Sequence, residues 1–197
     1  MHRYFIINKP YGVLSQFSRE VPSHRVLGDL FDFPPDVYPV GRLDRDSEGL
    51  LILTNDKRVN QTLLHPRHAH LRTYWARVEG HAQADDLAQL AQGVTIKLKG
   101  KMHRCAPLKV RVLKDTESGQ IPPRNPPVRF RKTVPDQWLE LQLTEGKNRQ
   151  VRRMCAKVGL PVLRLIRVRL ESLTLKDLAQ EQVQEVDQAW LFSRLKL

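Results

Sequence analysis

The sequence predicts an α+β fold dominated by an antiparallel or mixed β-sheet. Short stretches that alternate apolar and polar residues recur along the chain, and short amphipathic helical patterns separate them. A chain of 197 residues, 41% of them hydrophobic, is long enough for one sizeable core, which could be divided into two lobes. No internal repeat and no clear linker is visible. We therefore expect residues 1–197 to form a single domain.

The first half of the chain gives five predicted elements. Residues 4–7 favour a β-strand and lead into a turn over 8–12, where proline and glycine fix the backbone. Ser23 is placed to cap a short helix that ends at Phe31. A buried strand is expected over 50–54, and a helix over 57–64.

The second half continues this mixture. Residues 71–79 alternate as a strand, 85–92 form a short helix, and 94–113 hold further strands. Repeated prolines predict a long surface loop over 117–135. Three elements then follow, in the order strand, helix and strand, over residues 138–144, 148–158 and 161–175.

The chain is strongly basic, with 33 Lys and Arg against 21 Asp and Glu, a formal net charge of +12 and a pI near 10.1. Because Lys and Arg bind phosphates with release of counterions, we expect a polyanionic partner, although a basic protein without such a partner is the alternative. No run approaches the ~20 apolar residues that span a bilayer. A cytoplasmic protein is therefore expected.

Cysteine and histidine usage predicts neither a disulfide nor a metal site. Cys105 and Cys155 form no CxxC pair, and free thiols suit a reducing compartment. His65, His68 and His70 lack a cysteine or carboxylate set at ligand spacing. Since a Rossmann fingerprint and a P-loop are also missing, we expect no metal and no cofactor.

The most informative segment runs from Gly41 to residue 56, GRLDRDSEGLLILTND. It places the Asp44 carboxylate on a turn before a buried strand, where a rigid scaffold can present a reactive group, although an isolated loop aspartate more often caps a turn. The segment resembles the GRLDxxTxGLLxLTND motif of the pseudouridine synthases that modify single sites in ribosomal RNA, the branch related to the small-subunit enzyme A. Ser47 stands where threonine is commoner. The resemblance implies that Asp44 is catalytic, and that Asp46 and Asp56 are turn or capping residues.

A second segment, RTYWARVEG over 72–80, resembles the KTYxVxVxG stretch of the same family, with Arg72 where lysine is usual. The resemblance assigns Tyr74 to the site, where its ring could stack on an extruded base and contribute about 1 to 3 kcal/mol. From alternation alone, Tyr74 is more simply a core aromatic of a strand.

The third segment, EGKNRQVRRM over 145–154, resembles the family's motif almost letter for letter. Helical spacing predicts an inward face of Val151, Met154, Cys155 and Val158. It predicts a basic flank of Arg149, Arg152, Arg153 and Lys157. The flank could face phosphate, or it could be an ordinary solvated surface. The resemblance implies that Arg152 pairs with Asp44, that Val151 supports base binding, and that Arg149 and Arg153 bind RNA.

Weaker assignments complete the site. The stretch Asn8-Lys9-Pro10-Tyr11-Gly12 resembles the family's opening NKPxG motif, which supports the site, and Lys9 is expected to bind RNA. Arg42 could enter the space that the uridine leaves. The proline-rich loop, which is typical of a large-subunit branch, supplies four further candidates for binding the RNA backbone, namely Arg124, Arg129, Arg131 and Lys132.

The resemblance implies a pseudouridine synthase fold, with a sheet in two lobes, flanking helices and a central RNA-binding cleft, and here without an S4 RNA-binding domain. It implies a monomeric enzyme that isomerises one uridine of a structured stem-loop in 23S ribosomal RNA, through an aspartate and without a cofactor. A non-catalytic RNA-binding or ribosome-assembly factor is the main alternative. A glycosylase, which would release free uracil, is another.

Overall fold

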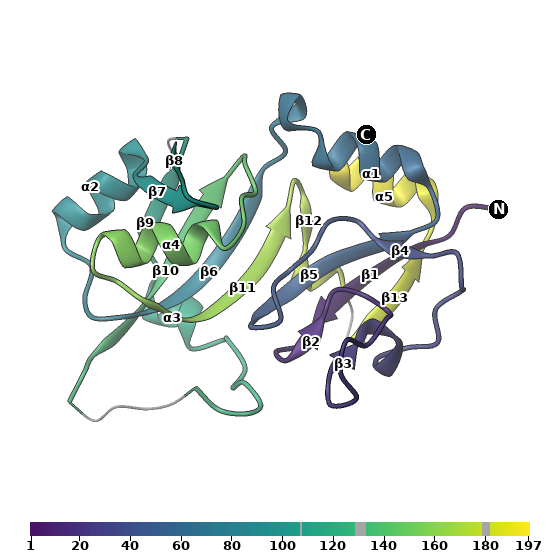
Figure 1. The fold of residues 1–197 in the computed structure, drawn as a ribbon, viewed down its shortest axis with the longest axis horizontal. Helices are drawn as coiled ribbons and strands as arrows, with labels where there is room; N and C mark the ends of the chain where they lie inside the picture. Colours follow the sequence, from purple (N-terminus) through teal and green to yellow (C-terminus); the bar gives the residue numbers. More distant parts are fainter. Residues whose placement is uncertain (107, 129–132, 179–181) are drawn as a thin grey trace. The chain divides into compact units, whose positions relative to one another are not determined.

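The computed structural model describes residues 1–106, 108–128, 133–178 and 182–197, and its chain divides into two compact units. Unit 1 contains residues 1–70 and 166–197, and unit 2 contains residues 71–165. Both units combine antiparallel strands with short helices (Figure 1). The expected α+β class with two lobes is therefore confirmed.

The sheet of unit 1 has β1 (Tyr4–Lys9) between β5 (Ser47–Thr54) and β13 (Val183–Val186), and both pairings are antiparallel. On one face of this sheet, alternate residues of β1 and β5 pack with α1 (Lys57–Leu64) and α5 (Gln188–Leu195) in a single core cluster. Since successive strand residues point to opposite faces, Phe5 lies on the other face, where its ring meets those of Phe31 and Phe33 at 5.9 and 5.3 Å.

The remaining elements of unit 1 are short. They are β2 (Val13–Leu14), β3 (Arg25–Val26), η1 (Leu27–Asp29), β4 (Tyr38–Pro39), η2 (Pro66–His68), β12 (Leu173–Thr174) and η3 (Leu175–Asp177). The helix expected from Ser23 to Phe31 is wrong. Arg25 and Val26 pair instead with Val13 and Leu14 as two parallel strands, and only one turn of 3₁₀-helix follows. Long-range pairing has overridden the local capping signal.

Unit 2 is a sheet of β6 (Arg72–Glu79), β10 (Asp136–Leu143) and β9 (Lys109–Val112), joined in antiparallel register with β10 in the middle. The helices α2 (Ala84–Gln92) and α4 (Gln150–Lys157) pack on one face of this sheet (Figure 1). Their buried residues are Leu90 from α2 and Val151, Met154 and Cys155 from α4.

Four further elements belong to unit 2 or carry the chain out of it. Strands β7 (Thr95–Leu98) and β8 (Lys101–Arg104) form a separate hairpin, and α3 (Asp115–Ser118) is a single turn at the start of the proline-rich loop. Strand β11 (Val162–Leu170) carries the chain from unit 2 back into unit 1. Among the described residues, no helix is long and apolar enough to cross a membrane.

The C-terminal elements β13 and α5 were not predicted from the sequence. Asp187 begins α5, since its carboxylate accepts a hydrogen bond from the backbone N–H of Trp190 at 2.8 Å. Leu191 and Leu195, four residues apart, are fully buried in the core of unit 1. An aspartate followed by this apolar spacing was the available signal for the helix.

Candidate active site

The loop that carries Asp44 is fixed by the N-terminal motif. The Ser15 hydroxyl donates to the Leu43 carbonyl at 2.8 Å and accepts from the Leu43 N–H at 3.1 Å. The Gly12 N–H donates to the Arg45 carbonyl at 2.8 Å. Asp44 lies between these two anchors, is half-buried, and its own carbonyl accepts from the Ser47 N–H at 3.0 Å, where β5 begins. Asp44 is therefore held on a rigid turn.

A close contact of two strands sets the position of this turn. A Cβ atom on Gly49 would lie 2.3 Å from the carbonyl oxygen of Arg167, so no other residue fits there. The Arg167 guanidinium is buried and donates to the Leu50 carbonyl at 2.8 Å. The glycine of the motif is therefore explained by the approach of β11 to β5 within unit 1.

Lys9 corrects an expectation. It is fully buried, and its ammonium donates to the carbonyls of Val13 and Pro10 at 2.7 and 3.0 Å, so it does not reach RNA directly. Burial lowers the pKa of Lys9 to about 8, against the opposing effect of the nearby charges of Glu48, Asp46 and Asp44. Lys9 is thus a buried cation close to the loop of Asp44, whereas the sequence had led us to expect that Lys9 binds RNA.

Tyr74 lies on β6 opposite Leu141. Its ring is partly buried and packs against the core cluster of unit 2, on the same strand face as Ala76 and Val78. The packing of Tyr74 therefore agrees with its interpretation as a core aromatic of a strand. Because the ring is only partly covered, the structure leaves part of Tyr74 open to a ligand.

Helix α4 presents the two faces that its spacing predicted. Val151, Met154 and Cys155 are buried, and burial raises the pKa of the Cys155 thiol to about 12, as expected for a structural cysteine. Val151 is thus a core residue in unit 2, 5% exposed. Arg152 is half-buried, and its Nη1 donates to the Val162 carbonyl at 3.0 Å.

The other arginines of α4 lie at the surface. Arg149 begins the helix with a left-handed backbone, at φ 50°. Arg153 is exposed, and its Nη1 donates to the Lys97 carbonyl on β7 at 2.8 Å.

The remaining basic candidates lie outside α4. Arg42 is exposed on the Asp44 loop of unit 1. Arg124 donates to the carbonyls of Pro126 and Pro127 at 2.7 and 3.1 Å, whereas Arg129, Arg131 and Lys132 lie outside the described residues.

A partly buried network that the sequence did not reveal orders the turn before α4. The Glu145 carboxylate accepts hydrogen bonds from the Ala106 N–H at 2.9 Å and from the Gln150 side-chain amide, and lies 3.3 Å from His103 Nε2. Gln150 in turn accepts from the Lys147 N–H at 2.9 Å. These contacts tie the EGKNRQ turn to the segment that follows β8.

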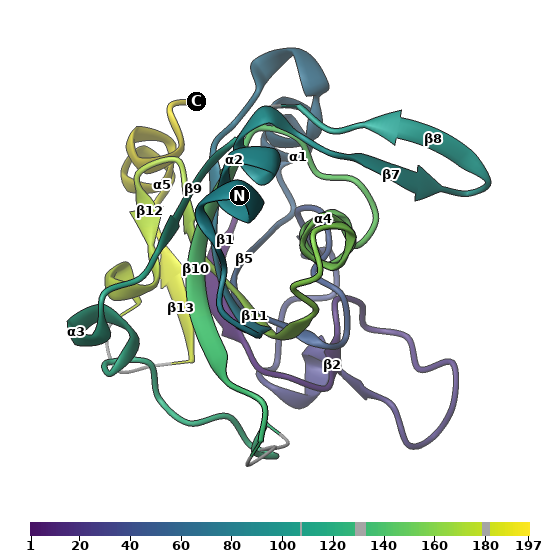
Figure 2. The ribbon, with the colours of Figure 1, turned by 90° about the vertical axis from the view of Figure 1, so that its left-hand side faces the viewer.

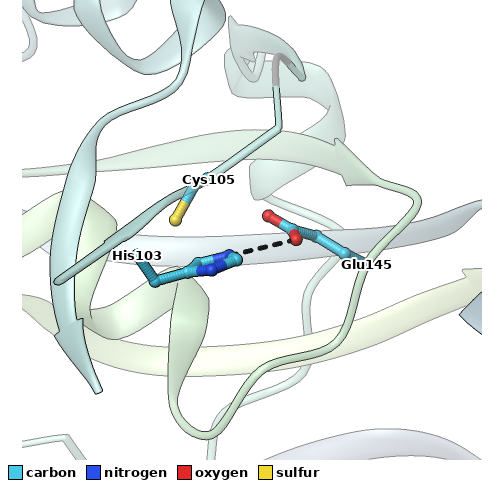
Figure 3. A group of neighbouring side chains, drawn as sticks. All are labelled: His103, Cys105 and Glu145. Atoms are coloured by element: carbon cyan, nitrogen blue, oxygen red, sulfur yellow. Dashed lines mark hydrogen bonds and ion pairs between the residues drawn. The ribbon is translucent and has the colours of Figure 1, made fainter. Parts of the chain in front are cut away.

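His103, Cys105 and Glu145 are also the residues that could hold a metal ion, because their ligand atoms lie within 4.8 Å of one another (Figure 3). The donors already present on Glu145 give this carboxylate a structural role without an ion. Burial, followed by the charge of Glu145, raises the pKa of the Cys105 thiol.

The capping role expected of Asp56 agrees with the structure, and the three histidines of the same region make contacts of their own. Asp56 begins α1, as expected of a capping residue, with its carboxylate accepting from the Arg58 N–H at 3.0 Å. His65 and His68 each make a local contact, with the Arg67 N–H and the Thr62 carbonyl, and His70 lies 3.2 Å from Glu171. Their rings also lie near one another, with centroids 5.4 Å apart for His65 and His68 and 5.8 Å apart for His68 and His70.

The candidate residues come from both units: Asp44, Arg42 and Lys9 belong to unit 1, whereas Tyr74, Val151 and Arg152 belong to unit 2. The family model described as RNA pseudouridylate synthase matches residues 3–157 of the chain. The chain therefore belongs to the RNA pseudouridylate synthase family, whose members convert uridine into pseudouridine in RNA.

Relatives narrow this class. The chain is 55% identical to the ribosomal large subunit pseudouridine synthase E of Xanthomonas axonopodis pv. citri (strain 306), over 88% of each chain. It is 32% identical to the ribosomal small subunit pseudouridine synthase A of Yersinia pestis, over 89% of this chain and 65% of the relative. A crystal structure of a pseudouridylate synthase aligns with a TM-score of 0.76 at 25% identity, over 99% of this chain and 74% of that one. The resemblance and the fold expected from the sequence are confirmed.

Proposed function

We propose that this protein isomerises a uridine of large-subunit (23S) ribosomal RNA to pseudouridine, with Asp44 as its catalytic residue. The observation that carries the proposal is the rigid presentation of Asp44 in a chain 55% identical to a large-subunit enzyme. The surplus of basic residues supplies the affinity for a polyanion.

Asp44 acts at the sugar of the target nucleotide, as a nucleophile at C1′ or as a base that removes a proton at C2′. In either route the bond from C1′ to N1 breaks, the uracil rotates within the site, and a new bond joins C1′ to C5. In the nucleophilic route this new bond displaces the Asp44 carboxylate from C1′, and in the other route the proton taken from C2′ returns to C2′. The hydrogen of C5 is lost and a proton is gained at N1, so substrate and product are isomers. No redox step and no external group is required.

The nucleotide must first leave its stack, which costs a few kcal/mol and least in a loop, so the substrate is an accessible uridine in a stem-loop. Tyr74 stacks on the extruded base, supported from behind by Val151. Arg152 binds and orients the Asp44 carboxylate through charge-assisted hydrogen bonds.

RNA affinity comes from Arg149, Arg153 and the proline-rich loop with Arg124, Arg129, Arg131 and Lys132, while Arg42 fills the space left by the uridine. We further propose that the two units form one catalytic domain and that the enzyme acts as a monomer in the cytoplasm, where ribosomal RNA is processed in bacteria.

The direct test compares wild type, Asp44→Asn and Asp46→Asn on unmodified large-subunit rRNA, free and in assembly intermediates, without added metal or cofactor. Pseudouridine is mapped by carbodiimide-dependent stops of reverse transcription. Wild type and Asp46→Asn are expected to give the same single new stop. Asp44→Asn, which changes the same charge two residues away, is expected to give none.

Two results would contradict the proposal. A stop that persists at full level in Asp44→Asn would remove this residue from the chemistry. Tight RNA binding without any stop, on either substrate, would favour a non-catalytic assembly factor, and release of free uracil would identify a glycosylase.

A further inference from the structure

Unit 2 carries a basic hairpin that none of the assignments above uses. Strands β7 and β8 pair in antiparallel register, with Lys97 opposite Met102 and Leu98 opposite Lys101. The segment 95–104 reads TIKLKGKMHR, with Lys97, Lys99, Lys101 and Arg104 but no acidic residue. All four basic residues are exposed. The hairpin is therefore a compact positive surface.

The two faces of the hairpin differ. Ile96 is buried and Leu98 packs against the core of unit 2, so this face is occupied by the protein. Lys97 and its cross-strand neighbour Met102, which is 68% exposed, point to the opposite face because strand residues alternate. Lys101, opposite Leu98, starts on the face of Leu98 but is itself exposed at the end of the hairpin. In the part of the chain that the structure describes, Lys97, Lys99 and Lys101 form no ion pair. Their charges face solvent.

The turn of the hairpin gives a second indication that its basic residues bind a ligand. Lys99 and Gly100 both have positive φ, at 46° and 84°, as the central residues of a tight hairpin turn do. Asparagine or aspartate suits the first of these positions better, and a lysine with a left-handed backbone is uncommon. The backbone geometry of the turn therefore does not account for a lysine at position 99, whereas the positive charge of Lys99 can bind an anion.

The hairpin is also held against the basic helix α4. Arg153 donates to the Lys97 carbonyl at 2.8 Å, and His103 lies 3.3 Å from Glu145, which orders the turn before α4. Arg104 donates to the Gln92 carbonyl at 3.1 Å at the end of α2. Figure 2 shows the hairpin extending away from the sheet of unit 2 near α4. The backbone of the hairpin is therefore fixed beside α4, which carries the exposed Arg153.

We propose that the β7–β8 hairpin is a second RNA-binding surface, on which Lys97, Lys99 and Lys101 bind backbone phosphates of the ribosomal RNA beyond the target nucleotide. The identity of the RNA rests on the proposed function. RNA is favoured over an acidic protein because the hairpin is joined to α4, whose arginines belong to the family's RNA-modifying motif. The lysines carry no sequence readout, since phosphate contacts fix register and orientation only.

The test removes the three charges in Lys97→Gln/Lys99→Asn/Lys101→Gln, with asparagine at 99 to preserve the turn. The matched control, Lys109→Gln/Lys114→Gln/Lys176→Gln, removes three exposed lysines elsewhere. The Kd for a transcript of large-subunit rRNA is measured from 50 to 300 mM KCl. In the hairpin variant, the slope of log Kd against log[KCl] is expected to fall by about 2 to 3, at 0.7 to 0.9 per lost phosphate contact. The control should keep the wild-type slope.

At saturating RNA, the turnover of the hairpin variant should remain within about twofold of wild type, because the lysines contribute to binding and not to the chemical step. A wild-type slope in the hairpin variant, or an equal fall in the control, would overturn the proposal. Weaker binding to heparin with an unchanged RNA slope would also overturn it. The slope is a binding measurement, so it is independent of pseudouridine formation, whose failure would instead count against the proposed function.

Discussion

At the scale of single residues, burial decides what the motif lysine and carboxylates do. Lys9 and Glu145 both belong to segments that resemble the family's motifs, yet Lys9 is fully buried, Glu145 is partly buried, and both are bonded to backbone groups. The motifs could be identified from the sequence. The sequence does not distinguish residues that are free to bind RNA from residues that stabilise the site, because burial and hydrogen-bond partners distant in the chain are not visible in it. Glu145 and Ala106, for example, are 39 residues apart.

Lys9 gives a pH dependence of stability. Its pKa is about 8 in the folded protein against 10.5 for an ordinary lysine, so between these values the unfolded chain binds more protons. The free energy of unfolding should therefore rise with pH from about 8 to 10.5, by about 3 kcal/mol from this group, and gain nothing from it below pH 8.

Urea unfolding of wild type and Lys9→Met at pH 7.5, 9 and 10 measures this effect. The variant should lack the rise that Lys9 contributes, so the difference between the two proteins should change across this range. Parallel stability curves would show that Lys9 is not buried as a cation.

At the scale of elements, local sequence signals predicted an element correctly where local contacts determine its structure. Helix α1 covers the predicted residues because Asp56 caps it and an amphipathic stretch follows. The helix expected after Ser23 failed because Arg25 and Val26 find strand partners in β2. Strand β13 pairs with β1, which lies far from it in the sequence, so its pairing is not visible in one segment. Helix α5 was missed although Asp187 gives a local capping signal.

The prediction at the scale of elements concerns the contribution of Asp56, which begins α1, to the free energy of unfolding. Its carboxylate caps α1 and accepts the Tyr4 hydroxyl at 2.8 Å, and hydrogen bonds from Arg58 hold the pKa of the Asp56 carboxyl well below its usual range. Asp56→Ala should cost about 2 to 4 kcal/mol at pH 7, since it removes the cap and leaves a buried hydroxyl without its acceptor.

Asp56→Asn, which can still cap the helix, should lose less than Asp56→Ala in the same urea titration. The depressed pKa means that the stabilisation by the charged carboxylate is present at neutral pH and is lost as the pH falls below about 4. Equal losses in both variants would show that capping is not the main contribution.

At the scale of the whole molecule, the two units differ in how the chain builds them. Unit 2 is continuous, whereas unit 1 combines the N-terminal part of the chain with residues 166–197. Strand β13 covers one edge of β1, and α5 fills the core with Leu191 and Leu195. Unit 1 therefore depends on residues far from its first strand.

A chain that ends at residue 182 tests this dependence. It should lose protection from amide hydrogen exchange in β1 and β5, because a strand edge and several core side chains are missing, but retain it in β6 and β10. Removing only residues 196 and 197 is the control and should preserve protection in both units. Protection of β1 and β5 in the shorter chain would contradict the dependence.

The discontinuity of unit 1 also orders events during biosynthesis. Translation proceeds at about 5 to 20 residues per second, so the last 32 residues follow the end of unit 2 by about 2 to 6 s. Unit 2, with its basic helix and hairpin, is complete in the nascent chain before the segment carrying Asp44 has its final core. Positive charge that can hold RNA thus emerges from the ribosome ahead of a finished catalyst.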